Sequence, residues 1–147
     1  MKLTYIQKLI ISGTSTVTNN ENETSEEKAK IGELWDKYVE ENIYSKTFNK
    51  ANNTAMYATY TDYENKDSGD YKVTIGVEVL KPKNAITIEK QKYLMFSKKG
   101  ELPQIVIELW KEILEYFENN NEYERAYTID LEKYAVEDEI EIYISIK

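Results

Sequence analysis

The sequence predicts an α+β fold in which a βαββ unit occurs twice about a pseudo-twofold axis. The antiparallel sheets would carry two helices on one face, with a central groove between the halves. Two observations support this prediction. The order strand, helix, strand, strand appears in each half of the chain, and the two predicted helices share a triplet, Glu33-Leu34-Trp35 and Glu108-Leu109-Trp110. Two such units placed side by side leave a concave seam between them.

The composition is that of one soluble globular domain spanning 1–147. The chain has 41% hydrophobic and 31% charged residues, within the usual range for such domains. The half-modules are expected at about 1–82 and 83–147, and a connection this short keeps them packed together. Since no apolar run approaches the roughly 20 residues of a membrane span, we expect a cytoplasmic protein with no membrane contact.

The first half begins with a β-branched run, Thr4 to Val17, that predicts a strand. Thr24-Ser25-Glu26-Glu27 has the pattern of a capping box, which predicts that a helix starts there. Its apolar residues recur at helical spacing and predict one buried face, formed by Ile31, Leu34, Trp35, Tyr38 and Val39.

Two strands complete that half. Ala51 to Tyr60 is predicted as the first, and the Asn, Asp, Ser and Gly residues of Thr61 to Gly69 predict a turn. From Tyr71 to Val79, apolar and polar residues alternate, which is typical of a strand with one buried face.

The second half repeats this order. A strand is predicted from Ile86 to Ser97, and Pro103 suits the first turn of a following helix. In the last strand, alternate positions favour one buried face, which leaves Tyr143 pointing the other way. The helical stripe consists of Val106, Leu109, Trp110, Ile113, Leu114 and Phe117, and the buried face of the last strand consists of Ile140, Ile142, Ile144 and Ile146.

The residues that are missing exclude most familiar enzyme chemistries. The chain has no cysteine and no histidine, which removes thiolate nucleophiles, imidazole bases, catalytic triads and the usual zinc sites. We therefore expect no metal and no cofactor. Any catalysis would depend on carboxylates, tyrosines, lysines or hydroxyls.

The charge and the aromatic content point away from nucleic acids and towards small molecules. A net charge of −8 repels phosphates, so direct nucleic-acid binding is not expected. Thirteen tyrosines are many for a chain of this size. Their rings either lie half-buried in strands, which tyrosine favours, or line a ligand site.

Glu132 is the candidate functional carboxylate, because Tyr127, Leu131 and Tyr134 make its predicted strand apolar and aromatic. If buried without a partner, it would have a raised pKa or would await a cationic or hydrogen-bonding ligand. The alternative is a solvated surface glutamate, the usual place for this residue in an acidic chain.

Aromatic residues could supply the rest of such a site. The two tryptophans, Trp35 and Trp110, lie on apolar helix faces, where core packing is the usual role and ligand contact the alternative. The strand tyrosines that face the seam could stack on a planar ligand, and the candidates are Tyr60, Tyr93, Tyr127 and Tyr143.

Several short motifs, in order along nearly the whole chain, resemble the GyrI-like small-molecule-binding domains, the effector-binding domains of AraC- and MerR-type regulators. The motifs are Ile31-Gly32-Glu33-Leu34-Trp35, Tyr60-Thr61-Asp62-Tyr63-Glu64, Asp70-Tyr71, Val77-Glu78-Val79, Lys92-Tyr93, Glu108-Leu109-Trp110, Tyr123-Glu124-Arg125-Ala126, Leu131-Glu132-Lys133-Tyr134 and Ile142-Tyr143-Ile144.

The resemblance implies a duplicated βαββ fold with an aromatic groove at the seam. In this family a groove glutamate, matched by Glu132, meets cationic or polar ligands, and Tyr143 corresponds to a groove residue. Ser145 stands where the family's Tyr-Ile-Pro ending usually has proline. That departure concerns the local backbone of the last strand.

The resemblance also implies three possible roles. The first is a stand-alone binder of hydrophobic, planar or cationic compounds, a sensor or sequestering protein of a transcription-regulatory system. The second is a hydrolase of cyclopropane-bearing or related toxic compounds, with Glu132 as its catalytic residue. The third is a protein-interaction module that contacts gyrase or a regulator. We expect a monomer or weak dimer.

Overall fold

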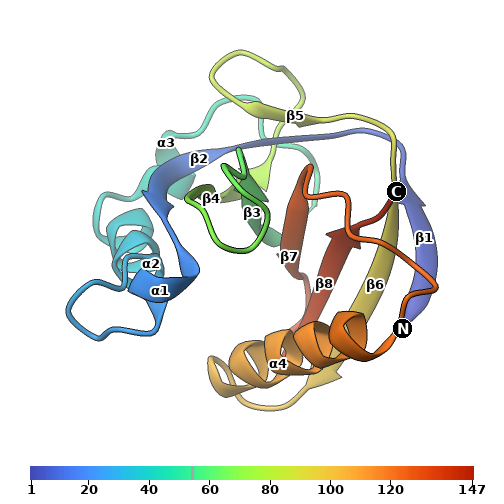
Figure 1. Cartoon of the computed structure of the whole chain (residues 1–147). Coiled ribbons are helices and arrows are strands. Elements are labelled where there is room, and N and C mark those ends of the chain that lie inside the picture. The colour runs from blue at the N-terminus through green and yellow to red at the C-terminus, as the bar shows by residue number, and fades with distance from the viewer. Residues whose placement is uncertain (54) are drawn as a thin grey trace.

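The computed structural model describes residues 1–53 and 55–147. Its described strands form one curled antiparallel sheet, a half-barrel, in the order β1-β6-β8-β7-β3-β4-β2-β5 (Figure 1). The strands are β1 (Lys2–Ile6), β2 (Leu9–Thr18), β3 (Met56–Thr61), β4 (Tyr71–Glu78), β5 (Ile86–Ile88), β6 (Gln91–Lys99), β7 (Asp130–Tyr134) and β8 (Glu139–Ser145), and the helices are α1 (Asn20–Glu23), α2 (Ile31–Glu40), α3 (Ile43–Lys46) and α4 (Gln104–Asn119).

The predicted α+β class with a duplicated unit is confirmed. The run β2-α2-β3-β4 in the first half corresponds to β6-α4-β7-β8 in the second. In the sheet, the order β3-β4-β2 on one side matches β7-β8-β6 on the other. The pseudo-twofold axis therefore passes between β3 and β7, which pair antiparallel with Ala58 opposite Glu132.

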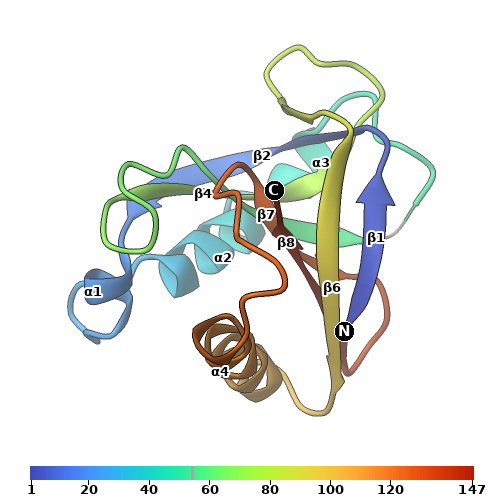
Figure 2. The same ribbon diagram turned by 45° about the vertical axis from the view of Figure 1, so that its right-hand side comes forward.

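Each half also contributes an edge strand to the other half. β1 precedes β2 in the chain but pairs with β6, and β5 precedes β6 but pairs with β2. Figure 2 shows β1 running alongside β6, with the N-terminus near the end of β6. The two halves are therefore joined by the central β3–β7 pair and by this reciprocal exchange of edge strands.

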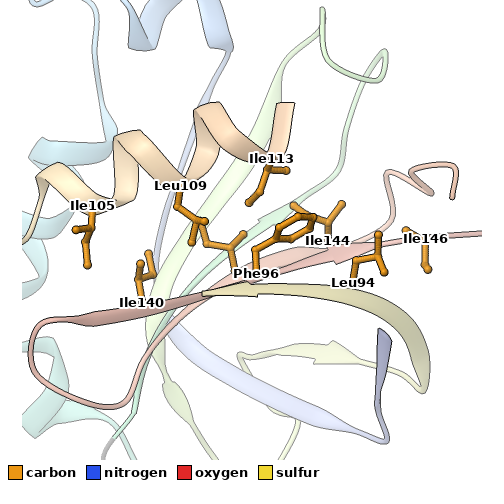
Figure 3. Close-up of a cluster of buried hydrophobic side chains, with 9 residues drawn as sticks. Leu94, Phe96, Ile105, Leu109, Ile113, Ile140, Ile144 and Ile146 are labelled. Atoms are coloured by element: carbon orange, nitrogen blue, oxygen red, sulfur yellow. The ribbon is translucent and has the colours of Figure 1, made fainter. Parts of the chain in front are cut away.

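Both long helices lie on the same face of the sheet. Helix α4 packs Leu109 and Ile113 onto β6 and β8 (Figure 3), while α2 packs Leu34 against β3 and β4. Cross-strand partners share a face, and Glu132 is paired with both Ala58 and Ile142. The central strands β3 and β7 thus form a floor between the helices.

The alternation of the last strand is confirmed. Its four isoleucines, Ile140 to Ile146, are each at most 1% exposed. Three of them lie on the helix face in β8, where Ile105 and the rest of α4 cover them. Tyr143 lies on the opposite face with Tyr57 and Leu131, as its alternate position predicts.

Two predicted strands are each divided in two. Thr4 to Val17 covers most of β1 and β2, and Ile86 to Ser97 covers β5 and most of β6. The breaks fall at the polar pairs Gln7-Lys8 and Glu89-Lys90. At both places the chain leaves one half of the sheet for the other, a long-range change of partner that local apolar content does not encode.

The prediction that a helix starts at Thr24 is wrong. Thr24 instead ends the single turn α1, whose N-cap is Asn19. Helix α2 begins at Ile31, and the cap comes from outside the helix: the Glu23 carboxylate accepts from the backbone N–H groups of Lys30 at 2.9 Å and Ile31 at 3.3 Å. An acceptor at a helix N-terminus satisfies its free N–H groups wherever it comes from.

The remaining elements differ in extent. The strand predicted from Ala51 to Tyr60 begins only at Met56, and Thr54 within that range lies outside the described residues. Helix α3 was not predicted. Val39, placed on the buried face of α2, is 74% exposed, whereas Leu34 and Tyr38 of the same helix are buried.

Two glycines face each other where β2 crosses β4. Gly13 and Gly76 are register partners. A Cβ atom on Gly76 would lie 2.0 Å from the carbonyl oxygen of Ser12, and one on Gly13 would lie 1.7 Å from that of Ile75. The two backbones can therefore approach this closely only because neither residue has a side chain.

Gly76→Ala should lower the free energy of unfolding by roughly 2 kcal/mol or more, because the strand backbones must separate. Gly32→Ala is the matched control, since a Cβ there meets nothing within 4 Å. It should raise stability by about 0.5–1 kcal/mol, as expected for glycine replaced in a helix. Urea unfolding measures both changes, and a Gly76→Ala protein as stable as the wild type would contradict the close approach of the two backbones at Gly76.

Candidate ligand-binding cavity

A cavity of about 780 Å³ lies over the central strands, between α2 and α4. This volume falls in the range of small-molecule sites, about 300–1,000 Å³. Trp35 of α2 and Trp110 of α4 line opposite walls, and Tyr60 of β3 with Glu132 of β7 lines the floor. Because the floor strands meet at the pseudo-twofold axis, the cavity occupies the seam between the halves, where the sequence predicts a groove.

Glu132 is held at the centre of the floor by three neutral donors. The hydroxyl of Tyr60 donates to Oε2 at 2.8 Å, and the indole N–H of Trp110 donates to the same oxygen at 2.7 Å. The hydroxyl of Tyr134 donates to Oε1 at 2.6 Å. These donors come from β3, α4 and β7, so the carboxylate connects a wall of the cavity to its floor.

The charge on Glu132 has no cationic partner among the described residues. Their ion pairs join Lys98 to Glu112, Arg125 to Asp130, and Lys147 to Glu124. The Glu132 residue is 2% exposed, and this burial raises its pKa, although its three hydrogen bonds act in the opposite direction. The floor therefore holds a carboxylate whose ionised form is costly until a positive charge comes close.

Aromatic rings surround this carboxylate. Trp35 meets Tyr134 edge to face with ring centroids 5.4 Å apart, and Trp110 meets Tyr60 in the same way at 5.5 Å. Tyr71 extends the wall, with its ring centroid 5.6 Å from that of Tyr60. Ring faces attract cations, so the walls and the carboxylate favour the same kind of ligand.

Burial, followed by the nearby Glu132 charge, raises the pKa of both Tyr60 and Tyr134 well above the usual value for a phenol. Both side chains therefore remain neutral hydroxyl donors across the physiological pH range. They stabilise the ionised carboxylate through hydrogen bonds without adding charge to the site.

A second buried carboxylate, Asp130, lies two residues before Glu132. Arg125 Nη2 donates to its Oδ2 at 2.8 Å, and the Tyr63 hydroxyl donates to the same atom at 2.6 Å. Its Oδ1 accepts from the Ser145 backbone N–H at 2.7 Å and from the Ser145 hydroxyl at 2.9 Å. Proline at position 145 would provide neither donor, so serine suits the backbone found here.

Of the seven aromatic and acidic residues predicted for the site, five line the cavity. These are Glu132, Tyr60, Tyr127, Trp35 and Trp110. The structure brings them together from α2, β3, α4, β7 and the segment before β7. Their contact with a ligand remains a prediction.

Tyr93 and Tyr143 do not line this cavity, which corrects the expectation that they face the groove. Both belong to the cluster on the opposite face of the sheet, where their rings meet at 6.2 Å. The Tyr93 hydroxyl donates to the carbonyl of Ile129 at 2.8 Å. Tyr143 points away from the cavity because side chains alternate along a strand, and its neighbours Ile142 and Ile144 occupy the helix face.

The cavity residues that sequence reasoning did not assign to the site include Tyr134, Tyr63, Tyr71 and Arg125. A signal existed for Tyr134, because residues two apart in a strand share a face and Glu132 was already a candidate. Arg125 also carried a signal, as the only arginine in a chain with 19 basic residues. Tyr63 reaches the cavity from the connection between β3 and β4, whose shape the sequence does not specify, and Tyr71 is the first residue of β4.

Two further findings concern other kinds of site. Within 1–53 and 55–147, no cluster of three or more acidic side chains is arranged to hold a metal ion. The helices in the same ranges include none with the length and apolar character needed to cross a membrane.

Comparison with known proteins identifies the family. A sequence profile of the Cass2 family, described as integron-associated effector binding proteins, matches residues 2–146. The chain belongs to the Cass2 family. The resemblance to GyrI-like effector-binding domains is thereby confirmed, and membership of an effector-binding family supports small-molecule binding as its general function.

The chain is similar over nearly its whole length to three known proteins. An integron cassette protein from the mobile metagenome of Vibrio cholerae is 32% identical, with a TM-score of 0.88 over 99% of this chain and 95% of that one. A putative transcriptional regulator, YobU of Bacillus subtilis, is 27% identical over 99% of this chain and 96% of its own length. SAV2435, solved with bound tetraphenylphosphonium, shares the fold at 19% identity and a TM-score of 0.79, over 99% of this chain and 93% of that one.

The two buried carboxylates should respond oppositely to neutralisation. Asp130→Asn leaves the buried Arg125 without its counter-charge and should cost about 3–5 kcal/mol of stability. Glu132→Gln removes a charge that has no cationic partner, so at pH 7 its stability should equal or exceed that of the wild type. Because the Glu132 pKa is raised in the fold, this advantage should shrink as the pH falls towards 4.5. Thermal unfolding across this pH range measures both effects. A strongly destabilised Glu132→Gln protein would contradict the view that the Glu132 charge has no cationic partner.

Proposed function

We propose that this protein binds a hydrophobic organic cation in the cavity between α2 and α4, with the Glu132 carboxylate as its counter-charge. The observation that carries the proposal is a buried carboxylate bound only by the neutral donors Tyr60, Trp110 and Tyr134. A cation placed above it would supply the missing charge. The three hydrogen bonds favour the ionised carboxylate against the burial that raises its pKa, and they hold it at the floor of the site.

The expected electrostatic gain in binding free energy is large enough to measure. A unit positive charge about 5 Å from the carboxylate, at an effective dielectric constant of about 20, gains roughly 3 kcal/mol. That energy corresponds to about a hundredfold in affinity. The rings of Trp35 and Trp110 would add cation–π attraction and apolar contact area.

The mouth of the cavity favours a ligand with a substantial apolar part. Ile107 and Leu114 of α4 line it while being 63% and 49% exposed, respectively. Exposed apolar side chains beside a pocket commonly mark a binding surface. A compound with a charged centre and bulky aromatic groups would cover them.

The biological role we propose is a sensor or sequestering protein within a regulatory system. The name of the Bacillus subtilis relative, a putative transcriptional regulator, favours this setting. The net charge of −8 argues against direct contact of this chain with DNA. Its regulatory effect would then pass through a protein partner that reads the ligand-bound state.

Glu132→Gln should weaken binding of tetraphenylphosphonium by about a hundredfold, because it removes the counter-charge but keeps the shape of the side chain. Glu141→Gln is the matched control, since Glu141 lies on β8 with its side chain hydrogen-bonded to Tyr143, away from the cavity. That control should bind as the wild type does. Neutral triphenylphosphine oxide should be nearly insensitive to either change.

Tryptophan quenching and calorimetry measure these affinities, and mass spectrometry of each mixture reports whether the compound stays intact. Equal affinity of wild type and Glu132→Gln for the phosphonium would overturn the proposal. Compound loss that depends on Glu132 would instead favour the hydrolase alternative.

The affinity for tetraphenylphosphonium should fall as the pH is lowered. Burial raises the pKa of Glu132 above 4.5, so protonation removes the counter-charge as the pH drops through that raised value. The charge of the phosphonium does not depend on pH. Titrations between pH 8 and pH 4.5 should therefore show a loss of affinity in the wild type and little change in Glu132→Gln, and a flat wild-type profile would count against Glu132 as the counter-charge.

A further inference from the structure

The cavity has a second polar position, at Arg125, that cation binding by Glu132 does not use. The Arg125 side chain is only 10% exposed and lines the cavity next to Tyr127. Its guanidinium carbon lies 4.3 Å from the centroid of the Tyr127 ring. Since every other basic residue in the chain is lysine, the planar donor fork of arginine occurs only here.

Arg125 has donor capacity left over. Its Nη2 donates to Asp130 at 2.8 Å, while its Nε is buried and has no acceptor among the described residues. Buried donors are nearly always paired, so an exception calls for an explanation. An acceptor brought by a ligand would provide one.

The backbone beside Arg125 is strained. Tyr127 has a φ of 53°, in the left-handed region that bulky side chains rarely adopt. This conformation accompanies the packing of its ring against both Tyr63 and the guanidinium. Backbone strain is often retained at ligand sites, and here it lies beside an unpaired donor in the wall of a cavity.

We infer that the ligand carries, besides its cationic centre, a neutral oxygen acceptor such as a carbonyl or ester oxygen, which binds the Arg125 guanidinium. This inference rests on the proposed function, because it specifies the chemistry of the same ligand. The Glu132 end of the cavity takes the positive centre. The Arg125 end takes the acceptor.

The surroundings favour a neutral acceptor over an anion. Asp130 already balances the charge of Arg125 at 2.8 Å, and the other charged residues that line the cavity are five glutamates or aspartates against two lysines, Lys66 and Lys111. An anionic group would therefore meet net repulsion in a protein of charge −8. A carbonyl oxygen gains a charge-assisted hydrogen bond without that repulsion.

The strand sets the spacing between the two positions. Asp130, which holds Arg125 at 2.8 Å, and Glu132 are two residues apart on β7 and share a face, so their Cα atoms are separated by roughly 6.6 Å. A ligand that reaches both ends needs a similar separation between its charge and its acceptor. Four methylene groups between a phosphonium and an ester carbonyl provide about this reach.

The test compares two triphenylphosphonium probes of equal chain length, one with a 4-(methoxycarbonyl)butyl arm and one with a heptyl arm. Calorimetry measures both probes against the wild type and against Arg125→Lys, which keeps the positive charge beside Asp130 but removes the planar fork. The ratio of ester to heptyl affinity should fall about tenfold in Arg125→Lys, while the heptyl affinity changes less than threefold. A third probe, with the free carboxylate, should bind more weakly than the ester.

Each outcome is decisive. If the heptyl probe fails to bind the wild type, the proposed function itself fails. If the heptyl probe binds but the ratio of ester to heptyl affinity is the same in the wild type and Arg125→Lys, the Arg125 inference is wrong and the proposed function stands. A carboxylate that binds tenfold better than the ester would overturn the neutral acceptor.

A second measurement needs no variant and so does not depend on the folding of Arg125→Lys. In the wild type, the advantage of ester over alkyl probes should peak when four methylenes separate the phosphonium from the carbonyl. With spacers of two or eight methylenes, the ester probe should bind no better than the alkyl probe. An advantage that does not vary with spacer length would overturn the inference.

Discussion

The fold around the cavity depends on how the Glu132 carboxylate is satisfied. Its three donors come from β3, α4 and β7, so one side chain ties a helix to the two strands at the pseudo-twofold axis. All three donors are neutral, which leaves the charge free to act on a ligand. Had one been a lysine or arginine, the same geometry would have produced a stable ion pair and no attraction for a cation.

The neighbouring carboxylate shows the contrast within one strand. Asp130 has a cation, a phenol and both donors of Ser145, so its role includes holding β7 against β8. Glu132 is two residues further on and shares the same face. The strand thus places a structural carboxylate beside the carboxylate that we propose for the ligand, and their partners alone distinguish them.

Much of this arrangement could be predicted from sequence, because it depends on local periodicity. The isoleucine alternation of β8 and the helical stripe of α4 each determine a face, and the repeated order of elements predicts the seam where Glu132 lies. Elements that depend on distant partners could not be predicted in the same way. The cap of α2 comes from Glu23, seven residues before Lys30, and Tyr93 takes its place from cross-strand pairing rather than from its own neighbours.

The exchange of β1 and β5 bears on how a ligand could enter. Many two-part binding proteins open like a clam about a hinge, with each lobe moving as a unit. Here β1 of the first half is paired with β6 of the second, and β5 with β2 in return, so separating the halves would break sheet hydrogen bonds on both edges as well as at the centre. Opening by separation of the halves is therefore disfavoured, so the floor of the cavity keeps a fixed width, and the selectivity of the site is set by side chains rather than by the closure of lobes.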